Sequence, residues 1–389
     1  MHTKLVVMQP TSLCNLDCSY CYVSDRQNAA KMSDVVLEAT FAKFLASPWT
    51  HDALEFLWHA GEPLTAGMAF YERALAYAHK HNAKGLQIRH TIQTNGVLLT
   101  DAWCRFLVQH QFCVGVSLDG PQPLHDSHRR TWGGTGSFDA SLKGLHRLRD
   151  AGLEPGLLCV LTAQSLQQPE AIYDFFAQLG VPWLAFNVEE VEGANRSAST
   201  STAACPDIRQ RYAHFLSVFF RRWMADGQPF RVREFDDFLS LTASVLQDPD
   251  YFRRPDELSP FAIFTVQRNG DLSTYSPEFA GASSARLNHF VLGNVVDVDL
   301  GRLPHSELFL TIQREVDAGI RNCARSCQWF ALCGGAYTSN KFYENGALDS
   351  TQTTACILHR QTLAQTLIHE LAAQPQSISS MQSVAVSPS

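Results

Sequence analysis

The sequence predicts an α/β fold, in which a partial (β/α)6 barrel is followed by a C-terminal unit with its own cysteine group. Three observations lead to this prediction. Short β-type runs alternate with helix-length amphipathic segments from residue 4 to about residue 190, polar residues gather where those runs end, and four cysteines form a separate group after residue 320. Because right-handed crossovers coil βα units around one axis, six such repeats favour a parallel sheet that closes part of a barrel.

The strand candidates are KLVVMQP, LEFLWH, LQIRHTIQT, FCVGVSLD, PGLLCVLT and WLAFNVE. An amphipathic stretch of helical length follows each of the first five. Ser33 is expected to cap the first helix, and Ser137 or Asp139 the fourth. The active site of such a barrel belongs at the carboxyl ends of the strands. The residues that fall there are Cys14, Glu62, Asn95, Ser117, Asp119 and Asn187.

Four segments are expected along the chain. They are the barrel (1–204), a charged helical bridge (205–260), an auxiliary domain (261–373) and a disordered tail (374–389). The hairpin signal FAIFTVQ-RNGD-LSTYS opens the auxiliary domain, and Asn269 and Gly270 are expected to supply the positive φ angles of its tight turn. A last helix is expected over about 355–373. The tail has no charge and many Ser, Gln and Pro residues, a composition typical of disorder.

Composition indicates a folded protein, because 45% of the 389 residues are hydrophobic. The formal net charge of -7 argues against a phosphate-binding surface, so no nucleic-acid partner is expected. The chain shows neither a signal peptide nor 18 consecutive apolar residues, which predicts a cytoplasmic protein with no membrane partner. In a reducing compartment, eleven cysteines indicate metal ligands plus buried thiols. The isolated ones, expected in the core, are Cys104, Cys113, Cys159 and Cys205.

Cys14, Cys18 and Cys21 form a C-x3-C-x2-C triplet in the run LCNLDCSYCY. Three thiolates can hold a [4Fe-4S] cluster and leave its fourth iron open to a small molecule. A zinc site or three unrelated core thiols is the alternative. The segment closely resembles the radical S-adenosylmethionine (SAM) enzymes, including the aromatic Tyr20 just before the last cysteine. The resemblance implies that SAM binds the open iron.

The run WHAGEP resembles the glycine-glycine-glutamate motif of these enzymes, with Ala60 in the first glycine position. Gly61 is expected to let the backbone approach the methionine part of SAM, and Glu62 to accept a hydrogen bond from its ammonium group. The same resemblance implies that Arg129 lies near the SAM carboxylate. The alternative is a set of polar strand-end turns and a surface arginine. The further cofactor-binding candidates at strand ends are Asn95, Ser117, Asp119 and Asn187.

A second cysteine group has the pattern C-x3-C-x5-C, followed by a distant fourth cysteine. Its members are Cys323, Cys327, Cys333 and Cys356. Four thiolates close a cluster, and the group resembles the C-terminal extension of the SPASM and Twitch subfamilies, although the usual opening there is C-x2-C. Where the full SPASM pattern has further cysteines, this chain has Tyr275 and Tyr337. We therefore expect SAM and two [4Fe-4S] clusters, one SAM-binding and one auxiliary, with four-thiolate zinc as the alternative for the second group.

The runs QPTSLCNLDCSYCYVSDR, YSPEF, LGN and CGGAYTSNKFYENG resemble the cyclophane-forming radical SAM/SPASM peptide maturases of the GrrM/OscB type. This resemblance implies a ribosomally made precursor peptide, in which an aromatic ring is joined to the β-carbon of a residue two positions further on. Glu278 in YSPEF is the candidate proton acceptor, although a lone glutamate beside a proline is more often at the surface.

The expected partners are the precursor peptide and a low-potential electron donor of the flavodoxin or ferredoxin type. Only 13 residues precede Cys14, so leader recognition is expected to use another surface or a separate leader-binding protein. Two other functions stay open. A sulfatase-type maturase oxidises Ser or Cys to formylglycine and normally has both auxiliary clusters. A non-catalytic metal-binding interaction protein would explain the cysteines but not the SAM-type motifs.

Overall fold

The computed structural model describes residues 1–248 and 250–373, and the tail predicted to be disordered lies outside them. Within these residues, ten strands form one sheet in the order β10-β9-β8-β1-β2-β3-β4-β5-β6-β7. Neighbours are parallel from β8 to β7, whereas β9 and β10 are antiparallel. The strands are β1 (Leu5–Met8), β2 (Ala53–Trp58), β3 (Gln87–Thr94), β4 (Cys113–Ser117), β5 (Gly156–Leu161), β6 (Trp183–Val188), β7 (Arg231–Val232), β8 (Ile263–Val266), β9 (Asp271–Thr274) and β10 (Gly293–Asn294).

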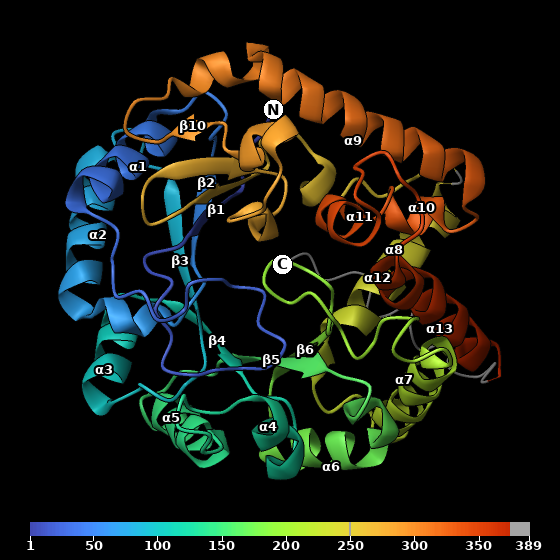
Figure 1. Cartoon of the computed structure of the whole chain (residues 1–389). Helices are drawn as coiled ribbons and strands as arrows, with labels where there is room; N and C mark the ends of the chain where they lie inside the picture. Colours follow the sequence, from blue (N-terminus) through green and yellow to red (C-terminus); the bar gives the residue numbers. More distant parts are fainter. Residues whose placement is uncertain (249, 374–389) are drawn as a thin grey trace.

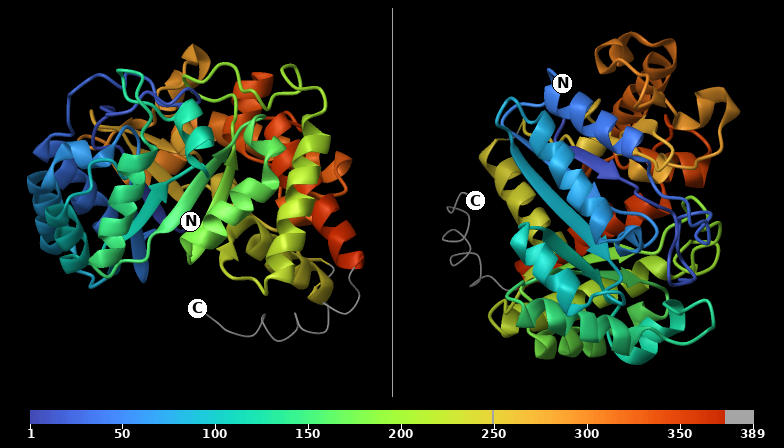
Figure 2. Two further views of the ribbon diagram at one scale, coloured as in Figure 1. Left: turned by 90° about the horizontal axis from the view of Figure 1, so that it is seen from below. Right: turned by 90° about the vertical axis from the view of Figure 1, so that its left-hand side faces the viewer.

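The helices are α1 (Asp34–Ala46), α2 (Met68–His81), α3 (Asp101–Gln109), α4 (Gln122–His128), α5 (Phe138–Asp150), α6 (Pro169–Leu179), α7 (Ile208–Ala225), α8 (Arg233–Gln247), α9 (Glu307–Ser326), α10 (Phe330–Cys333), α11 (Thr338–Asn345), α12 (Thr354–Cys356) and α13 (Leu363–Ala372). Most of them lie outside the curved sheet and cover its convex face, whereas α11 and α12 lie on the open side of the barrel (Figures 1 and 2). The six strands predicted from the sequence are β1 to β6, which confirms the α/β partial-barrel fold class.

Alternating side chains place the core between the sheet and these helices. On β2, Phe56 and Trp58 are both fully buried and point to the same face, since side chains two apart in a strand share a face. Phe41 of α1 packs against both, with ring centroids 4.6 Å and 6.5 Å away. The residues that alternate with these along each strand therefore line the inner face of the barrel. The polar residues of the predicted site lie at the carboxyl ends of the strands and in the loops after them.

The segment 205–260 contains the expected helices, α7 and α8, and also β7, which pairs with β6 and forms one edge of the sheet. Helix α7 packs between α6 and the last helix α13. Arg221 on α7 and Glu370 on α13 form an ion pair at 2.6 Å. The C-terminal end of the described chain is therefore held against the barrel wall.

Strands β8 and β9 form the predicted hairpin, and β8 also pairs in parallel with β1. The prediction for its turn was wrong in one respect. Gly270 has a positive φ of 90°, but Asn269 is not in the left-handed region. The reason is that the Gly270 N–H donates to Gln267 O at 2.8 Å, which makes Arg268 and Asn269 the centre of a turn that needs a left-handed residue only at its end.

The helix caps follow the prediction in part. Ser33 accepts a hydrogen bond from the Val36 N–H at 3.3 Å, so its role as N-cap of α1 is confirmed. Ser137 precedes α5, but its hydroxyl donates to Arg129 O, and the Phe138 N–H at the start of α5 instead donates to Asp126. The carboxylate of Asp126 on α4 therefore accepts the hydrogen bond from the first N–H of α5, a role for which the sequence suggested Ser137 or Asp139.

The isolated cysteines are buried at positions 104, 159 and 205, as predicted, but Cys113 is exposed. Cys113 is the first residue of β4 and has the opposite parity to the buried Val114 and Val116. It therefore faces away from the core. Among the described residues, no helix is both long enough and apolar enough to cross a membrane.

Candidate functional site

The loop that carries the first three cysteines follows β1 and is held in place by the turn after β2. The Glu62 N–H donates to Leu13 O at 2.8 Å. A Cβ on Gly61, whose φ is 58°, would come within 2.8 Å of Ser12 and 2.6 Å of Leu13 O. The structure thus gives Gly61 a close contact with the cysteine loop itself, one residue before Cys14. Only glycine fits such an approach.

The three thiols lie near one another, with Cys18 buried and Cys14 and Cys21 half-buried. Burial is the largest of the effects that raise the pKa of Cys14 to about 12, and the neighbouring Cys18 and Cys21 act in the same direction. Among the described residues, no three His, Cys, Asp or Glu side chains converge as closely as a single metal ion requires. A zinc ion holds sulfur at about 2.3 Å, whereas each cysteine of a [4Fe-4S] cluster binds a different iron. Three thiols can hold three of the four irons of such a cluster.

Glu62 joins the ends of β2 and β3. It is only 1% exposed, and its Oε1 accepts hydrogen bonds from the Leu64 N–H at 3.1 Å and from Thr94 Oγ1 at 2.8 Å. Its Oε2 accepts from the Asn95 N–H at 2.8 Å. Burial raises the pKa of Glu62 to about 7 against the effect of these hydrogen bonds. Oε2 has room for a further donor such as an ammonium group.

Asn95 and Ser117 lie at neighbouring strand ends. The Asn95 Nδ2 donates to Asn15 Oδ1 at 2.8 Å and lies 3.9 Å from Cys14 Sγ. Asn95 therefore ties the end of β3 to the cysteine loop. At the end of β4, Ser117 Oγ accepts a hydrogen bond from Gln93 Nε2 at 3.0 Å.

Tyr20, Asp119 and Arg129 form one buried unit. Arg129 Nε and Nη2 donate to the two oxygens of Asp119 at 2.8 and 3.1 Å, and the Tyr20 hydroxyl donates to the same carboxylate. The Arg129 guanidinium also lies 5.4 Å from the centre of the Tyr20 ring. Burial opposes ionisation of Asp119, but the charge and hydrogen bonds of Arg129, together with the Tyr20 hydrogen bond, outweigh it and lower the pKa of Asp119. A SAM carboxylate would therefore have to share Arg129 with Asp119.

The four C-terminal thiols come from the ends of three helices. Cys323 lies in the last turn of α9, and Cys327 is the residue just after this helix, where the backbone is extended. The Cys327 N–H still donates to Cys323 O at 2.9 Å, so the three intervening residues of the C-x3-C opening span one helical turn. Cys333 ends α10 and packs with Cys356, which ends α12. Burial and the nearby Cys333 and Cys327 thiols raise the pKa of Cys356 to about 12.

Tyr275 and Tyr337 occupy the positions where further cysteines of the SPASM pattern would lie. Tyr275 is buried, and its ring stacks on Phe309 with centroids 6.4 Å apart. Tyr337 accepts a hydrogen bond from Arg360, whose guanidinium lies 5.1 Å from the centre of the Tyr337 ring. Packed aromatic side chains therefore stand at both positions.

A group of carboxylates between the barrel and the auxiliary cysteines was missed by the sequence analysis. Asn340 Nδ2 on α11 donates to Glu190 at 2.8 Å and to Glu192 at 2.9 Å, and His359 Nε2 lies 2.9 Å from Glu190. Burial raises the pKa of Glu192 well above its usual value, and the charges of Glu190 and Glu278 add to this. The only signal was the acidic run EEVE directly after the sixth strand.

Glu278, the predicted proton acceptor, belongs to this group. It is half-buried, and Ser276 donates to its carboxylate. Burial raises its pKa to about 7, and the charges of Glu190 and Glu257 contribute in the same direction. The remaining candidate, Asn187, is exposed and accepts a hydrogen bond from Arg233 at 2.8 Å.

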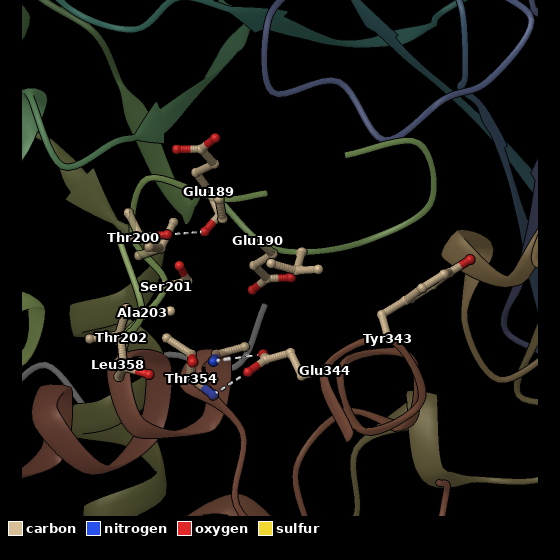
Figure 3. Close-up of a pocket in the computed structure, with 14 residues that line it drawn as sticks. Glu189, Glu190, Thr200, Ser201, Thr202, Ala203, Tyr343, Glu344, Thr354 and Leu358 are labelled. Carbon is tan, nitrogen blue, oxygen red and sulfur yellow. Dashed lines mark hydrogen bonds between the residues drawn. The ribbon is translucent and has the colours of Figure 1, made fainter. Parts of the chain in front are cut away.

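A pocket of about 210 Å³ opens beside the carboxylates, between the end of β6 and helices α11 and α12 (Figure 3). Glu190 and Tyr343 line it, as does Glu344, which accepts hydrogen bonds from the Thr354 and Ala355 N–H groups. A second pocket, of about 200 Å³, lies where Ser12 and Tyr22 of the cysteine loop meet the β8–β9 turn.

The Radical SAM superfamily model matches residues 8–191. A protein described as uncharacterised protein sll1766, from Synechocystis, is 37% identical over 95% of this chain and 92% of its own length. A serine-type anaerobic sulfatase-maturating enzyme from Bacteroides thetaiotaomicron is 28% identical over 87% of this chain and 83% of its own. The structure of native anSMEcpe with bound AdoMet and Cp18Cys peptide superposes with a TM-score of 0.75 and 22% identity, over 97% of this chain and 99% of that one.

Proposed function

The chain belongs to the Radical SAM superfamily, and is therefore an enzyme that uses SAM and an iron-sulfur cluster, and from this premise we propose that it is a peptide maturase. Its product would be a carbon-carbon cross-link, a three-residue cyclophane, between an aromatic ring and a β-carbon of a ribosomally made precursor peptide. A peptide substrate agrees with the peptide named in the anSMEcpe complex and with the sulfatase-maturating relative.

The observation that carries the proposal is the position of two consecutive residues, Asn340 and Lys341, in the segment that is most specific to the cyclophane-forming resemblance. Asn340 donates to Glu190 and Glu192, and Lys341 donates to Cys323 Sγ at 3.6 Å. Adding a carbon radical to an aromatic ring requires the later loss of one electron and one proton. Helix α11 touches both the carboxylates that could take a proton and the thiols that could hold an electron acceptor.

We assign the N-terminal thiols to the SAM-binding cluster and Glu62, Asn95 and Ser117 to contacts with SAM. When bound, SAM on the reduced cluster supplies a 5'-deoxyadenosyl radical that removes hydrogen from a substrate carbon. Glu62 would accept the SAM ammonium, and Asn95 would hold the cysteine loop against β3. Low-potential electrons would come from a flavodoxin- or ferredoxin-type donor, and a separate protein could present the leader.

The C-terminal thiols fit one auxiliary [4Fe-4S] cluster, whose chemistry is one-electron exchange. They are four in number, with Cys327 half-buried and the other three buried, and they come from segments that the fold brings to one place. Glu278 is the proposed proton acceptor, because a carboxyl with a pKa of about 7 is partly ionised at neutral pH yet basic enough to take a proton.

Formylglycine formation is the second candidate, and the similarity to a serine-type sulfatase-maturating enzyme favours it. Tyr275 and Tyr337 count against it, since that reaction normally goes with two auxiliary clusters. The deciding experiment is co-expression with a short open reading frame from beside the gene. We expect a peptide lighter by two hydrogens per link, with no backbone fragmentation inside the linked three residues. An aldehyde trapped by a hydrazine reagent would support formylglycine formation and exclude the cross-link.

A further inference from the structure

Lys341 is a buried cation beside a cysteine. Its side chain lies on α11 and is only 1% exposed. Its Nζ donates a hydrogen bond to Cys323 Sγ at 3.6 Å. Lysine is seldom buried unless a partner compensates its charge, and here the partner is sulfur, not a carboxylate. Packing alone does not account for a lysine ammonium group that is buried beside a thiol.

Helix α9 makes room for this ammonium group. Gly319 lies inside the 20-residue helix, where glycine is an unfavourable residue. A Cβ at Gly319 would come within 2.9 Å of Lys341 Nζ and 2.5 Å of Leu348 O. Gly319 is one turn before Cys323, so the two share a helix face. The glycine thus opens the space through which the lysine reaches the sulfur.

The ammonium group opposes the surrounding negative charge. Burial raises the pKa of the Cys323 thiol, the nearby Cys333 and Cys327 thiols add to the increase, and Lys341 lowers it through its charge and hydrogen bond. A half-buried cation close to the group, Arg360, lies near Cys333 but donates to Tyr337. Lys341 is therefore the cation in hydrogen-bond contact with Cys323.

We propose that Lys341 is a positioning residue for the auxiliary cluster, one that raises its reduction potential by donating a charged hydrogen bond to Cys323 Sγ. This inference rests on the proposed function, since it takes the four C-terminal thiols as cluster ligands. A cluster gains one negative charge on reduction, and a buried ammonium group stabilises the reduced form more than the oxidised form. Hydrogen bonds to the ligand sulfurs and net charge are what set such potentials. The cluster would thereby accept an electron more readily.

The test uses full-length protein in which Cys14→Ala, Cys18→Ala and Cys21→Ala leave only the auxiliary site. Lys341→Gln, Lys341→Met and Lys341→Arg are made in this background, and the midpoint potential is followed by electron paramagnetic resonance. Gln and Met should lower the equilibrium constant for reduction about tenfold, which is about 59 mV for one electron. Lys341→Arg should keep the midpoint potential close to its value with lysine, because it retains the positive charge. Arg325→Gln, which removes an exposed charge from α9, the helix that carries Cys323, should leave the potential unchanged because water screens this charge.

Two results would overturn the inference. The first is an unchanged midpoint in Lys341→Gln and Lys341→Met with full iron content. The second is loss of iron in both variants but not in Lys341→Arg, which would assign Lys341 to cluster assembly and not to its potential. A background protein that holds no iron while Lys341 is intact would refute the auxiliary cluster itself. That outcome is a failure of the proposed function and is recognised from the iron content before any titration.

Discussion

Gly61 packs directly against the backbone of Leu13, so closely that a Cβ on Gly61 would lie 2.6 Å from the Leu13 carbonyl oxygen. The next peptide N–H, that of Glu62, donates to the same oxygen at 2.8 Å. The glycine of the WHAGEP turn therefore shapes the cysteine loop, in addition to any approach that it allows to SAM. The two sequence motifs meet through their backbones.

Gly61→Ala should displace the cysteine loop, because two rigid backbone segments would clash with the new methyl group. We expect about half of the iron to be lost, that of the SAM-binding site, while the auxiliary site keeps its cluster. Iron analysis and electron paramagnetic resonance of reconstituted protein measure this. Gly67→Ala is the control, since Gly67 also has a positive φ, 88°, but nothing lies within 4 Å of its Cβ position. Equal iron loss in both variants would point to backbone strain and not to the contact with Leu13.

Glu62→Gln should weaken SAM binding about tenfold or more with iron content intact, because the ammonium contact loses its charge. It should also lower the thermal midpoint, since the amide would direct an N–H toward groups that now donate to the carboxylate. Equilibrium dialysis with labelled SAM gives the affinity. Glu55→Gln is the matched control, because Glu55 lies on β2 itself and, like Glu62, accepts a hydrogen bond from a threonine of β3, at 2.6 Å, but away from the carboxyl end. If Glu62→Gln binds SAM like the wild type, Glu62 is only a turn residue.

Reconstituted protein should contain about eight iron atoms, following from two four-iron clusters. Replacing Cys14, Cys18 and Cys21 by Ala should leave about half, held by the C-terminal thiols. Replacing Cys323 and Cys356 by Ala should leave the other half. Metal analysis of the anaerobically prepared wild type and variants measures these iron contents. About twelve iron atoms in the wild type, or zinc at the C-terminal site, would contradict this assignment.

The parallel sheet could be predicted from sequence because each strand is a compact apolar run, and local patterning decides such elements. The cysteine groups could be found because thiolate spacing is short in sequence. The carboxylate group could not be found in the same way, because Glu192 and Asn340 are 148 residues apart and meet only through the fold. The same holds for Lys341 and Gly319, whose relation depends on how α11 packs against α9. Contacts between distant segments have no local signature.

Turnover should rise with pH through about 7, because Glu278 must be ionised to accept a proton and burial holds its pKa near that value. Glu278→Gln should remove this rise and slow product formation by roughly 10²-fold or more, the usual contribution of a general base. Glu257→Gln is the control. Loss of the Glu257 charge should lower the pKa of Glu278 and move the rise to lower pH without removing it. A profile unchanged in Glu278→Gln would assign the proton transfer to another group, for which Glu192 is a candidate because the charge of Glu278 raises its pKa.

The reaction should consume one SAM per link and transfer one substrate hydrogen to the nucleoside. A precursor peptide deuterated at the β-carbon of the linked residue should give 5'-deoxyadenosine with one deuterium, while a peptide deuterated only on the aromatic ring should give unlabelled nucleoside. The ring deuterium should instead be lost to solvent, because rearomatisation releases it as a proton to the base. Glu278→Gln should still form labelled nucleoside, since abstraction precedes proton loss, but should accumulate little linked peptide. Mass spectrometry of nucleoside and peptide from the same sample gives both ratios. Deuterium taken from a serine or cysteine side chain, together with an aldehyde product, would show formylglycine chemistry and exclude the cyclophane.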